Sequence, residues 1–412
     1  MPRPNRHRRL LLFLALYLAF CLLAGIFLAD GTMHPSRRPL TPEDQSTMQT
    51  IAHNLDSELE DVTITTPDAT TLRAWIIRPH HTNGNAAILL HGLADNRAGM
   101  TGYAQLLLTH GFTVLLPDAR AHGQSGGQLA TYGLLERNDI HQWFDFLSAQ
   151  SHPTCIYGLG ESMGAAELLQ SLEAKPKEVE PHFCAVAAES SFSSFREIAY
   201  DRMGQPFHLG PWFGRTLLRS VVEFAFLYVR LKYHLDMQQV SPENSVAATK
   251  VPVFLIHGQI DSNIPLRHAH EIQSRNPKAI LWEVPNADHC GAISTSPKEF
   301  EHRLLEWFST AHVETAASAV PPKRSKAEAF TNPWPLPFCI SCALPVHNQS
   351  LRSSKSFRSR NPANRTPALH APYSHISVTF LIRADLGKSL PNIFLNCTKN
   401  TELTTSPLPR TF

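Results

Sequence analysis

Short apolar runs recur along the middle of the chain and alternate with longer amphipathic stretches, and this alternation restricts the fold more than any other feature. The runs lie at residues 86–90, 112–116, 155–159, 184–188, 251–256 and 280–284. Short runs of this kind fit strands that are buried on both faces of a sheet. The stretches at 99–110, 131–150, 163–174 and 297–310 are long enough for crossover helices. The sequence therefore predicts an α/β fold, a mostly parallel sheet with helices on both faces.

Composition divides the rest of the chain into segments. Residues 62–66 and 72–77 alternate around a Pro-Asp turn and predict an antiparallel hairpin, so the main domain is expected over residues 59–314. Within it, residues 195–236 are crowded with aromatic and apolar side chains and predict a helical cap insert. Residues 31–58 are polar and are interpreted as a linker. Residues 315–412 are rich in Pro, Ser, Arg and Asn and predict a disordered tail.

The N-terminus carries the pattern of a membrane segment. Arg3, Arg6, Arg8 and Arg9 precede an uncharged run from Leu10 to Ala29, which as a helix is about 30 Å long, one bilayer core. Residues 1–30 therefore predict a single transmembrane helix in the inner (cell) membrane. Because the positive flank stays in the cytoplasm, the following domain is expected on the periplasmic or extracytoplasmic side. The alternative is a cleaved signal peptide and a secreted protein.

Charge and cysteine content limit the partners. A formal net charge of +2 gives no basic footprint for nucleic acid, so no nucleic-acid partner is expected. The seven cysteines are scattered and do not form a disulfide framework. Cys155 and Cys184 fall inside apolar runs and are interpreted as free thiols that pack as small hydrophobes. The Cys339–Cys342 pair lacks further ligands, so neither a metal nor another cofactor is expected.

Ser162 is the candidate nucleophile. It lies in Gly160-Glu161-Ser162-Met163-Gly164, directly after the apolar run 155–159 and directly before a helical pattern. This strand, turn and helix context is what a nucleophile elbow requires. A second match, Gly123-Gln124-Ser125-Gly126-Gly127, is separated from its strand and is followed by no helix. Ser125 is therefore interpreted as part of a glycine-rich loop.

A serine nucleophile needs a base and an acid that orients the base. Asp261 follows the run 251–256, and His289 follows the run 280–284, so both are expected in loops at the ends of strands. Glu189, which ends the run 184–188, is the competing acid. The oxyanion hole is expected from the backbone N–H groups of Leu93 and Met163.

Taken together, these motifs resemble the α/β-hydrolase superfamily, in its serine aminopeptidase and acyl-hydrolase-like branch. The resemblance covers about residues 60–312 and includes His91-Gly92-Leu93, the segment from Asp118 to Ser125, Asp261 and His289. It implies the triad Ser162, Asp261 and His289, with oxyanion donors Leu93 and Met163. His122 stands where the family often has a glycine, a departure confined to one loop.

The expected activity is hydrolysis of a carboxylic ester or thioester through an acyl-enzyme on Ser162. The expected partner is a small acyl substrate, and lipids are among the candidates because the insert is apolar and the N-terminal helix brings the domain to a membrane. Two alternatives stay open: a serine peptidase acting on short peptides, and a non-catalytic binding module on the same fold. The sequence does not give the oligomeric state.

Overall fold

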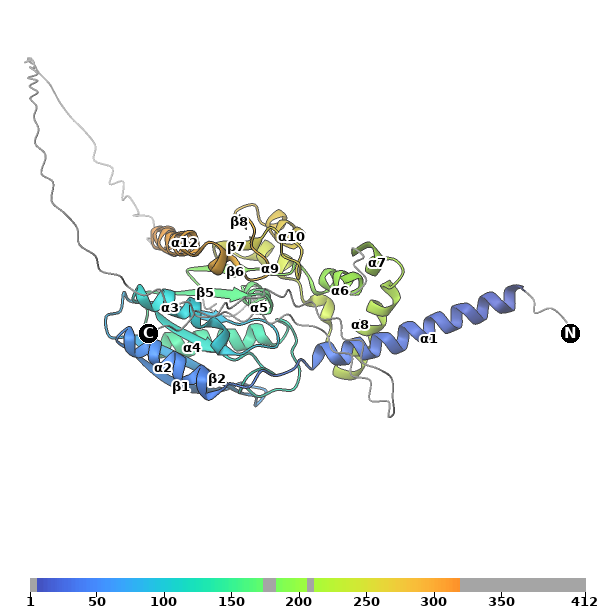
Figure 1. Ribbon diagram of the computed structural model, residues 1–412, viewed down its shortest axis with the longest axis horizontal. Coiled ribbons are helices and arrows are strands. Elements are labelled where there is room, and N and C mark those ends of the chain that lie inside the picture. Colours follow the sequence, from blue (N-terminus) through green and yellow to red (C-terminus); the bar gives the residue numbers. More distant parts are fainter. Residues whose placement is uncertain (1–5, 173–182, 206–210, 319–412) are drawn as a thin grey trace, which may run out of the picture. The chain divides into compact units, whose positions relative to one another are not determined.

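A computed structural model describes residues 6–172, 183–205 and 211–318 (Figure 1). The predicted tail lies outside the described residues, apart from its first four positions, which continue the last helix to Ser318.

The described residues contain an eight-stranded sheet with the order β1-β2-β4-β3-β5-β6-β7-β8. The strands are β1 (Ser57–Thr65), β2 (Thr71–Pro79), β3 (Asn85–Leu90), β4 (Thr113–Pro117), β5 (Cys155–Glu161), β6 (Ala185–Glu189), β7 (Val253–Gly258) and β8 (Ile280–Val284). From β4 to β8 in this order all pairs are parallel, and β2 is antiparallel to both of its neighbours. The predicted hairpin and all six predicted strands are confirmed, and so is the α/β fold class. Strand β8 lies at the edge of the sheet and is only partly buried, with Ile280 exposed.

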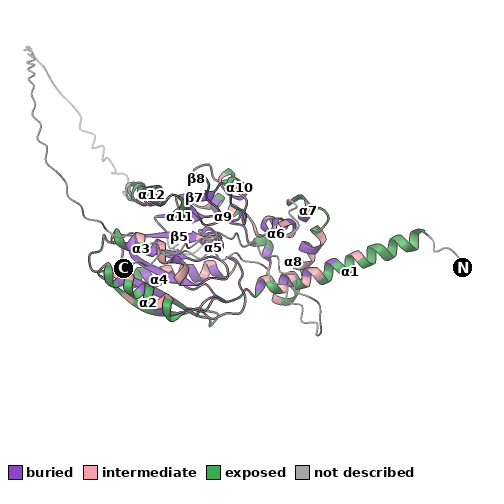
Figure 2. Ribbon diagram, in the orientation of Figure 1, coloured by how far each residue is buried: buried purple, intermediate pink, exposed green. Residues whose placement is uncertain are grey.

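Helices cover the sheet on both faces. The helices around the sheet are α2 (Pro42–Asn54), α3 (Thr101–Thr109), α4 (Glu136–Ser151), α5 (Met163–Gln170), α9 (Pro242–Ala248), α10 (Arg267–Arg275), α11 (Ala292–Thr295) and α12 (Pro297–Ser318). One apolar cluster joins the sheet to α2, α3, α11 and α12, and a second joins it to α4, α5, α9 and α10. In Figure 2 the sheet is buried between these layers. The site is therefore built on a rigid three-layer frame.

The segment predicted as a linker contains a helix, which corrects that interpretation. Helix α2 begins at Thr41, whose side chain accepts a hydrogen bond from the Asp44 amide while the Asp44 carboxylate caps the Thr41 amide. This reciprocal capping box, followed by a proline at the first helical position, is a strong helix start. Met48 and Ala52 are fully buried in the first apolar cluster. The polar composition of the segment reflects only the exposed face of α2.

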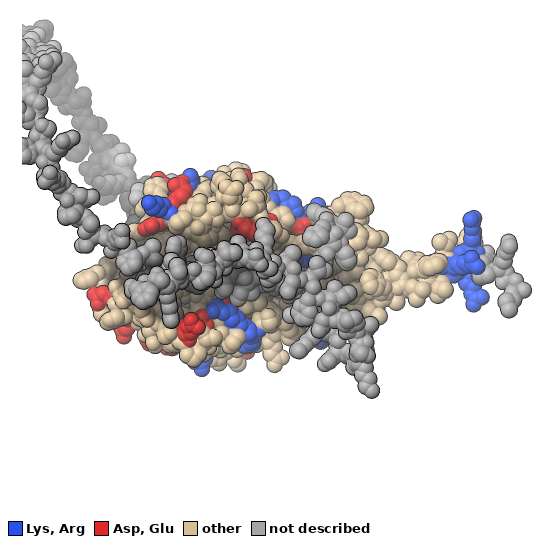
Figure 3. Space-filling view, viewed as in Figure 1, with Lys and Arg blue, Asp and Glu red and all other residues tan. Residues whose placement is uncertain are grey.

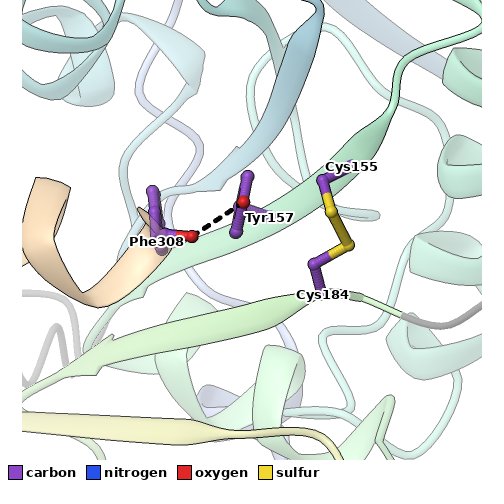
Figure 4. The surroundings of a disulfide bond; sticks show 4 residues. All are labelled: Cys155, Tyr157, Cys184 and Phe308. Atoms are coloured by element: carbon purple, nitrogen blue, oxygen red, sulfur yellow. Dashed lines mark hydrogen bonds between the residues drawn. A yellow bond between two sulfur atoms is a disulfide. The ribbon is translucent and has the colours of Figure 1, made fainter. Parts of the chain in front are cut away.

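Cys155 and Cys184 form a disulfide, which contradicts their interpretation as free thiols (Figure 4). Cys155 begins β5 and Cys184 directly precedes the neighbouring strand β6, with their Cα atoms 5.8 Å apart. A pair of cysteines in adjacent parallel strands has no characteristic spacing in the sequence, because a crossover of variable length separates them. The pairing becomes visible only when the strand order is known.

A third apolar cluster lies outside the sheet. Helices α6 (Phe195–Gly204), α7 (Pro211–Arg215) and α8 (Arg219–Tyr233) follow β6 in the interval of the predicted cap insert. Buried side chains of α6 and α8 pack with Met163 at the start of α5. The cluster also includes Ala29 and Met33 from the end of α1 (Arg6–Met33), the candidate membrane span, which contains an 18-residue stretch with a mean hydropathy of 2.8.

Candidate active site

Ser162 lies in a sharp turn between β5 and α5. Its backbone has φ 51° and ψ −112°, a conformation that non-glycine residues rarely adopt. The flanking glycines permit the turn: a Cβ on Gly160 would lie 2.5 Å from the Gly164 carbonyl oxygen, and one on Gly164 would lie 2.4 Å from the Leu90 carbonyl oxygen. The Ser162 amide donates to the Glu189 carbonyl oxygen at 2.8 Å, which fixes the turn to the end of β6. Ser162 therefore has the predicted elbow geometry, and contacts with the surrounding chain stabilise its strained backbone conformation.

His289 and Asp261 reach Ser162 from the loops that follow β8 and β7. The Nε2 atom of His289 lies 2.9 Å from Ser162 Oγ, and its Nδ1 atom lies 2.9 Å from Asp261 Oδ2. Because an ionised carboxylate can only accept, Nδ1 carries the proton that Asp261 binds, and Nε2 is left to accept from the serine hydroxyl. The structure thus joins the three predicted residues in one chain of hydrogen bonds.

The Asp261 carboxylate is buried and accepts several hydrogen bonds. Its side chain is buried, and Oδ1 accepts from the amides of Asn263, at 2.9 Å, and Ile264, at 2.7 Å. Burial by itself would raise the pKa of Asp261, but the His289 hydrogen bond and charge, with the Ile264 amide, outweigh it and lower the pKa. Asp261 therefore stays ionised beside the imidazole.

Two competing candidates are placed elsewhere. The Glu189 side chain accepts from Tyr103 Oη and from the Ala292 amide, both at 2.9 Å, so it is not the acid bonded to His289. Ser125 Oγ is buried, donates to the Asp118 carbonyl oxygen at 2.8 Å and accepts from the Arg73 amide at 2.9 Å. Ser125 therefore ties a loop to β2, in agreement with its interpretation as a loop residue.

The two predicted oxyanion donors flank the serine. Met163 is the first residue of α5, so its N–H is one of the unpaired donors of a helix start. On the other side, a Cβ on Gly92 would lie 3.6 Å from Ser162 Cβ, which places the turn that contains Leu93 against the elbow. Within residues 6–172, 183–205 and 211–318, neither N–H has a hydrogen-bond acceptor. Both are free to bind a developing oxyanion.

Sequence reasoning considered Glu189 only as a competing acid and did not predict that its carboxyl group pairs with that of Glu161 behind the elbow. Glu161 and Glu189 are register partners on β5 and β6, so their side chains point to the same face of the sheet. Burial, and then the neighbouring Glu189, raise the pKa of Glu161 to about 8, against a hydrogen bond from the Gly92 amide. The only signal in the sequence is that each glutamate ends an apolar run. In the described ranges, no group of three or more His, Cys, Asp or Glu side chains is arranged to hold a metal ion.

Known proteins share this arrangement of elements. The chain is 26% identical over 247 residues to the uncharacterized protein YqkD of Bacillus subtilis, covering 59% of this chain and 77% of that one. It is 28% identical over 245 residues to the uncharacterized protein YfhR of Escherichia coli, covering 57% and 75%. A solved structure of an esterase from Pyrococcus furiosus is 27% identical, with a TM-score of 0.52, over 68% of this chain and 98% of that one.

The model of the alpha/beta hydrolase family matches residues 87–303, more than half of the chain. This range includes the elbow, both oxyanion positions and the loops that carry Asp261 and His289. The chain therefore belongs to the alpha/beta hydrolase family.

Proposed function

We propose that the protein is a serine hydrolase that cleaves carboxylic esters or thioesters through an acyl-enzyme on Ser162. The observation that carries this proposal is the continuous chain of hydrogen bonds from Ser162 Oγ through His289 to Asp261, at 2.9 Å for each contact. The likeness to an esterase structure supports an ester rather than a peptide as substrate.

The geometry supports a two-step acyl transfer. His289 Nε2 takes the hydroxyl proton as Ser162 Oγ attacks the carbonyl carbon, and the Leu93 and Met163 amides stabilise the oxyanion. Collapse expels the alcohol or thiol, which takes the proton from His289. Water then attacks the acyl-enzyme, with His289 as base, and releases the acid and the free serine.

The test is hydrolysis of p-nitrophenyl esters, from acetate to palmitate, by the full-length chain in detergent. Ser162→Ala is expected to lose nearly all activity, and Ser125→Ala, which changes the other Gly-x-Ser-x-Gly motif, is expected to keep it. Circular dichroism checks that both variants are folded. Full activity in Ser162→Ala would overturn the proposal. Cleavage of short peptides but of no ester would favour the peptidase.

We also propose that α1 stays in the mature protein and that the hydrolase domain is extracytoplasmic. The basic residues before the apolar run support this orientation, and in Figure 3 blue basic side chains gather at the outer end of α1. The Cys155–Cys184 disulfide supports an oxidising compartment. The mass of the protein recovered from membranes tests retention: loss of about thirty N-terminal residues would mean a cleaved signal.

A further inference from the structure

Exposed apolar side chains are concentrated on two neighbouring elements. Among the described residues, every large apolar side chain that is exposed lies on α1 or in the α7–α8 segment (residues 211–233), except Ile260 and Ile280. In the α7–α8 segment the exposed members are Trp212, Leu217, Leu227 and Leu231. Such a concentration marks an interaction surface rather than ordinary surface composition.

Helices α1 and α8 lie side by side and run in the same direction. Tyr17 Oη donates to the Leu217 carbonyl oxygen at 2.7 Å, and Lys232 Nζ contacts Asp30 Oδ1 at 2.8 Å. Between these points Gly25 lets the backbones approach, since a Cβ there would lie 2.8 Å from the Val221 carbonyl oxygen. The contacts extend from Tyr17 to Asp30, about 20 Å of helix.

The exposed leucines in and just before α8 lie next to α1. Leu227 and Leu231 of α8, with Leu217 just before it and the half-buried Phe224, recur at spacings that place them on one helical face. Helical periodicity puts this face next to the side that contacts Gly25. The charged side of α8 is turned toward α6: Glu223 accepts from Arg196 at 2.8 Å and from Tyr200 at 3.1 Å.

The contacts between α1 and α8 determine the depth of α8 in the membrane if α1 spans it. If residues 10–29 cross the hydrocarbon core, Asp30 and Lys232 mark the headgroup level, and the Tyr228 and Tyr233 rings lie against the Lys232 ammonium there. Tyrosine and lysine at one level are typical of a membrane interface. The rest of α8 then runs beside the outer half of the span, where water is scarce.

We propose that α1 and α8 enter the outer leaflet together, with the face of Leu217, Phe224, Leu227 and Leu231 against lipid acyl chains. Continuity with α1 selects this occupant, because the exposed leucines lie beside the exposed apolar side chains of α1, and the charged contact between the two helices, Lys232 with Asp30, lies at the headgroup level. The cap is then part of the membrane-bound surface, and α1 is more than a tether.

This placement connects the leaflet to the nucleophile. The apolar cluster under α8 contains Phe226 and Val222 and extends to Met163, which is adjacent to Ser162. The side chains packed between α8 and the elbow are therefore apolar. Resting on the proposed hydrolase function, the substrate class is an ester of a long acyl chain dissolved in the outer leaflet.

Fluorescence of Trp212 tests the surface independently of activity. The full-length chain is reconstituted in phosphatidylcholine vesicles with plain or brominated acyl chains, and the Trp212→Phe difference isolates the signal of Trp212. We expect brominated lipid to quench this signal. A control tryptophan is introduced by His302→Trp, at an exposed position of α12, in the Trp212→Phe background. Its fluorescence should be quenched by acrylamide but not by brominated lipid. Equal behaviour of the two tryptophans, or burial of Trp212 in a detergent-stable dimer, would overturn the proposal.

Activity tests the substrate class. The double variant Leu227→Gln, Leu231→Gln is expected to lose about tenfold or more of the rate on a long-chain ester in vesicles and to keep its rate on p-nitrophenyl acetate. Ile280→Gln, an equally exposed change on β8, should affect neither rate. Equal loss on both esters would contradict leaflet delivery. A wild-type chain that is inactive on both esters would overturn the hydrolase proposal. The quenching of Trp212 would still show whether the α7–α8 segment contacts lipid.

Discussion

His289 is held between two oxygen atoms that come from different loops. Asp261 fixes Nδ1, and the Asp288 carboxylate accepts from the His289 amide at 2.8 Å and from the Ser262 amide at 2.8 Å. The Asp288 bonds join the loop of the base to the loop of the acid. The imidazole therefore reaches Ser162 in one tautomer and one orientation.

Asp261→Asn is expected to reduce kcat by about 10³ to 10⁴ and to leave KM nearly unchanged. The amide cannot hold the Nδ1–H tautomer or stabilise the imidazolium that forms during attack. Steady-state kinetics on a p-nitrophenyl ester measure the effect, with Glu189→Gln as the comparison. A larger loss of kcat in Glu189→Gln than in Asp261→Asn would show that Asp261 is not the acid that orients His289.

Glu161 predicts a pH-dependent stability. Burial first, and then Glu189, raise its pKa from the ordinary 4.5 to about 8 in the folded state. Between these values the folded protein holds a proton that the unfolded chain has released, so stability falls as pH rises, by at most about 1.4 kcal/mol per unit from this group. Urea unfolding from pH 5 to pH 8 should show a smaller decrease in Glu161→Gln than in wild type. Identical pH profiles would refute the shift.

The sequence located the three residues of the hydrogen-bonded chain because each follows an apolar run, and parallel strands bring such positions to one edge of a sheet. It favoured Asp261, in the loop after β7, over Glu189 at the end of β6, but it could not show which of the two contacts His289, because that depends on which loop turns toward the imidazole. Nor could it show that Glu161 and Glu189 are register partners, since register follows from strand order.

At the level of elements, the strands were predictable and a mostly polar helix was not. The strands β3 to β8 are short and dominated by apolar residues, as expected for strands inside a sheet. Helix α2 was missed because only Met48 and Ala52 are buried, which leaves a polar sequence. Its signal was local: Thr41 and Asp44 form a capping box around a proline.

The disulfide between β5 and β6 is expected to stabilise the fold. Cys155 and Cys184 are separated by 29 residues. Closing a loop of this length lowers the entropy of the unfolded chain by an amount worth about 3 to 4 kcal/mol. Urea unfolding of Cys155→Ala, Cys184→Ala should show a loss of this order, and a reducing agent should destabilise the wild type but not the variant. If the reducing agent leaves the free energy of unfolding of the wild type unchanged, the disulfide is not formed.

At the scale of the whole described unit, α1 belongs to the folded domain as well as to the candidate span. The Ala130 amide donates to the Met33 carbonyl oxygen at 3.0 Å, and Tyr132 Oη donates to the Thr32 carbonyl oxygen at 2.8 Å. The apolar run predicted a membrane helix, but hydropathy says nothing of a protein partner. The small residues Gly25 and Ala29, one helical turn apart, are the sequence feature that indicates close packing of α1 against another helix.

The central claim is that Ser162 is the nucleophile. Its most direct test is to treat the folded full-length protein with a fluorophosphonate and to locate the adduct by peptide mass spectrometry. We predict one adduct, on Ser162, which is absent in Ser162→Ala and forms far more slowly in His289→Ala. An adduct on another serine, or a folded wild-type chain that never reacts, would contradict the account.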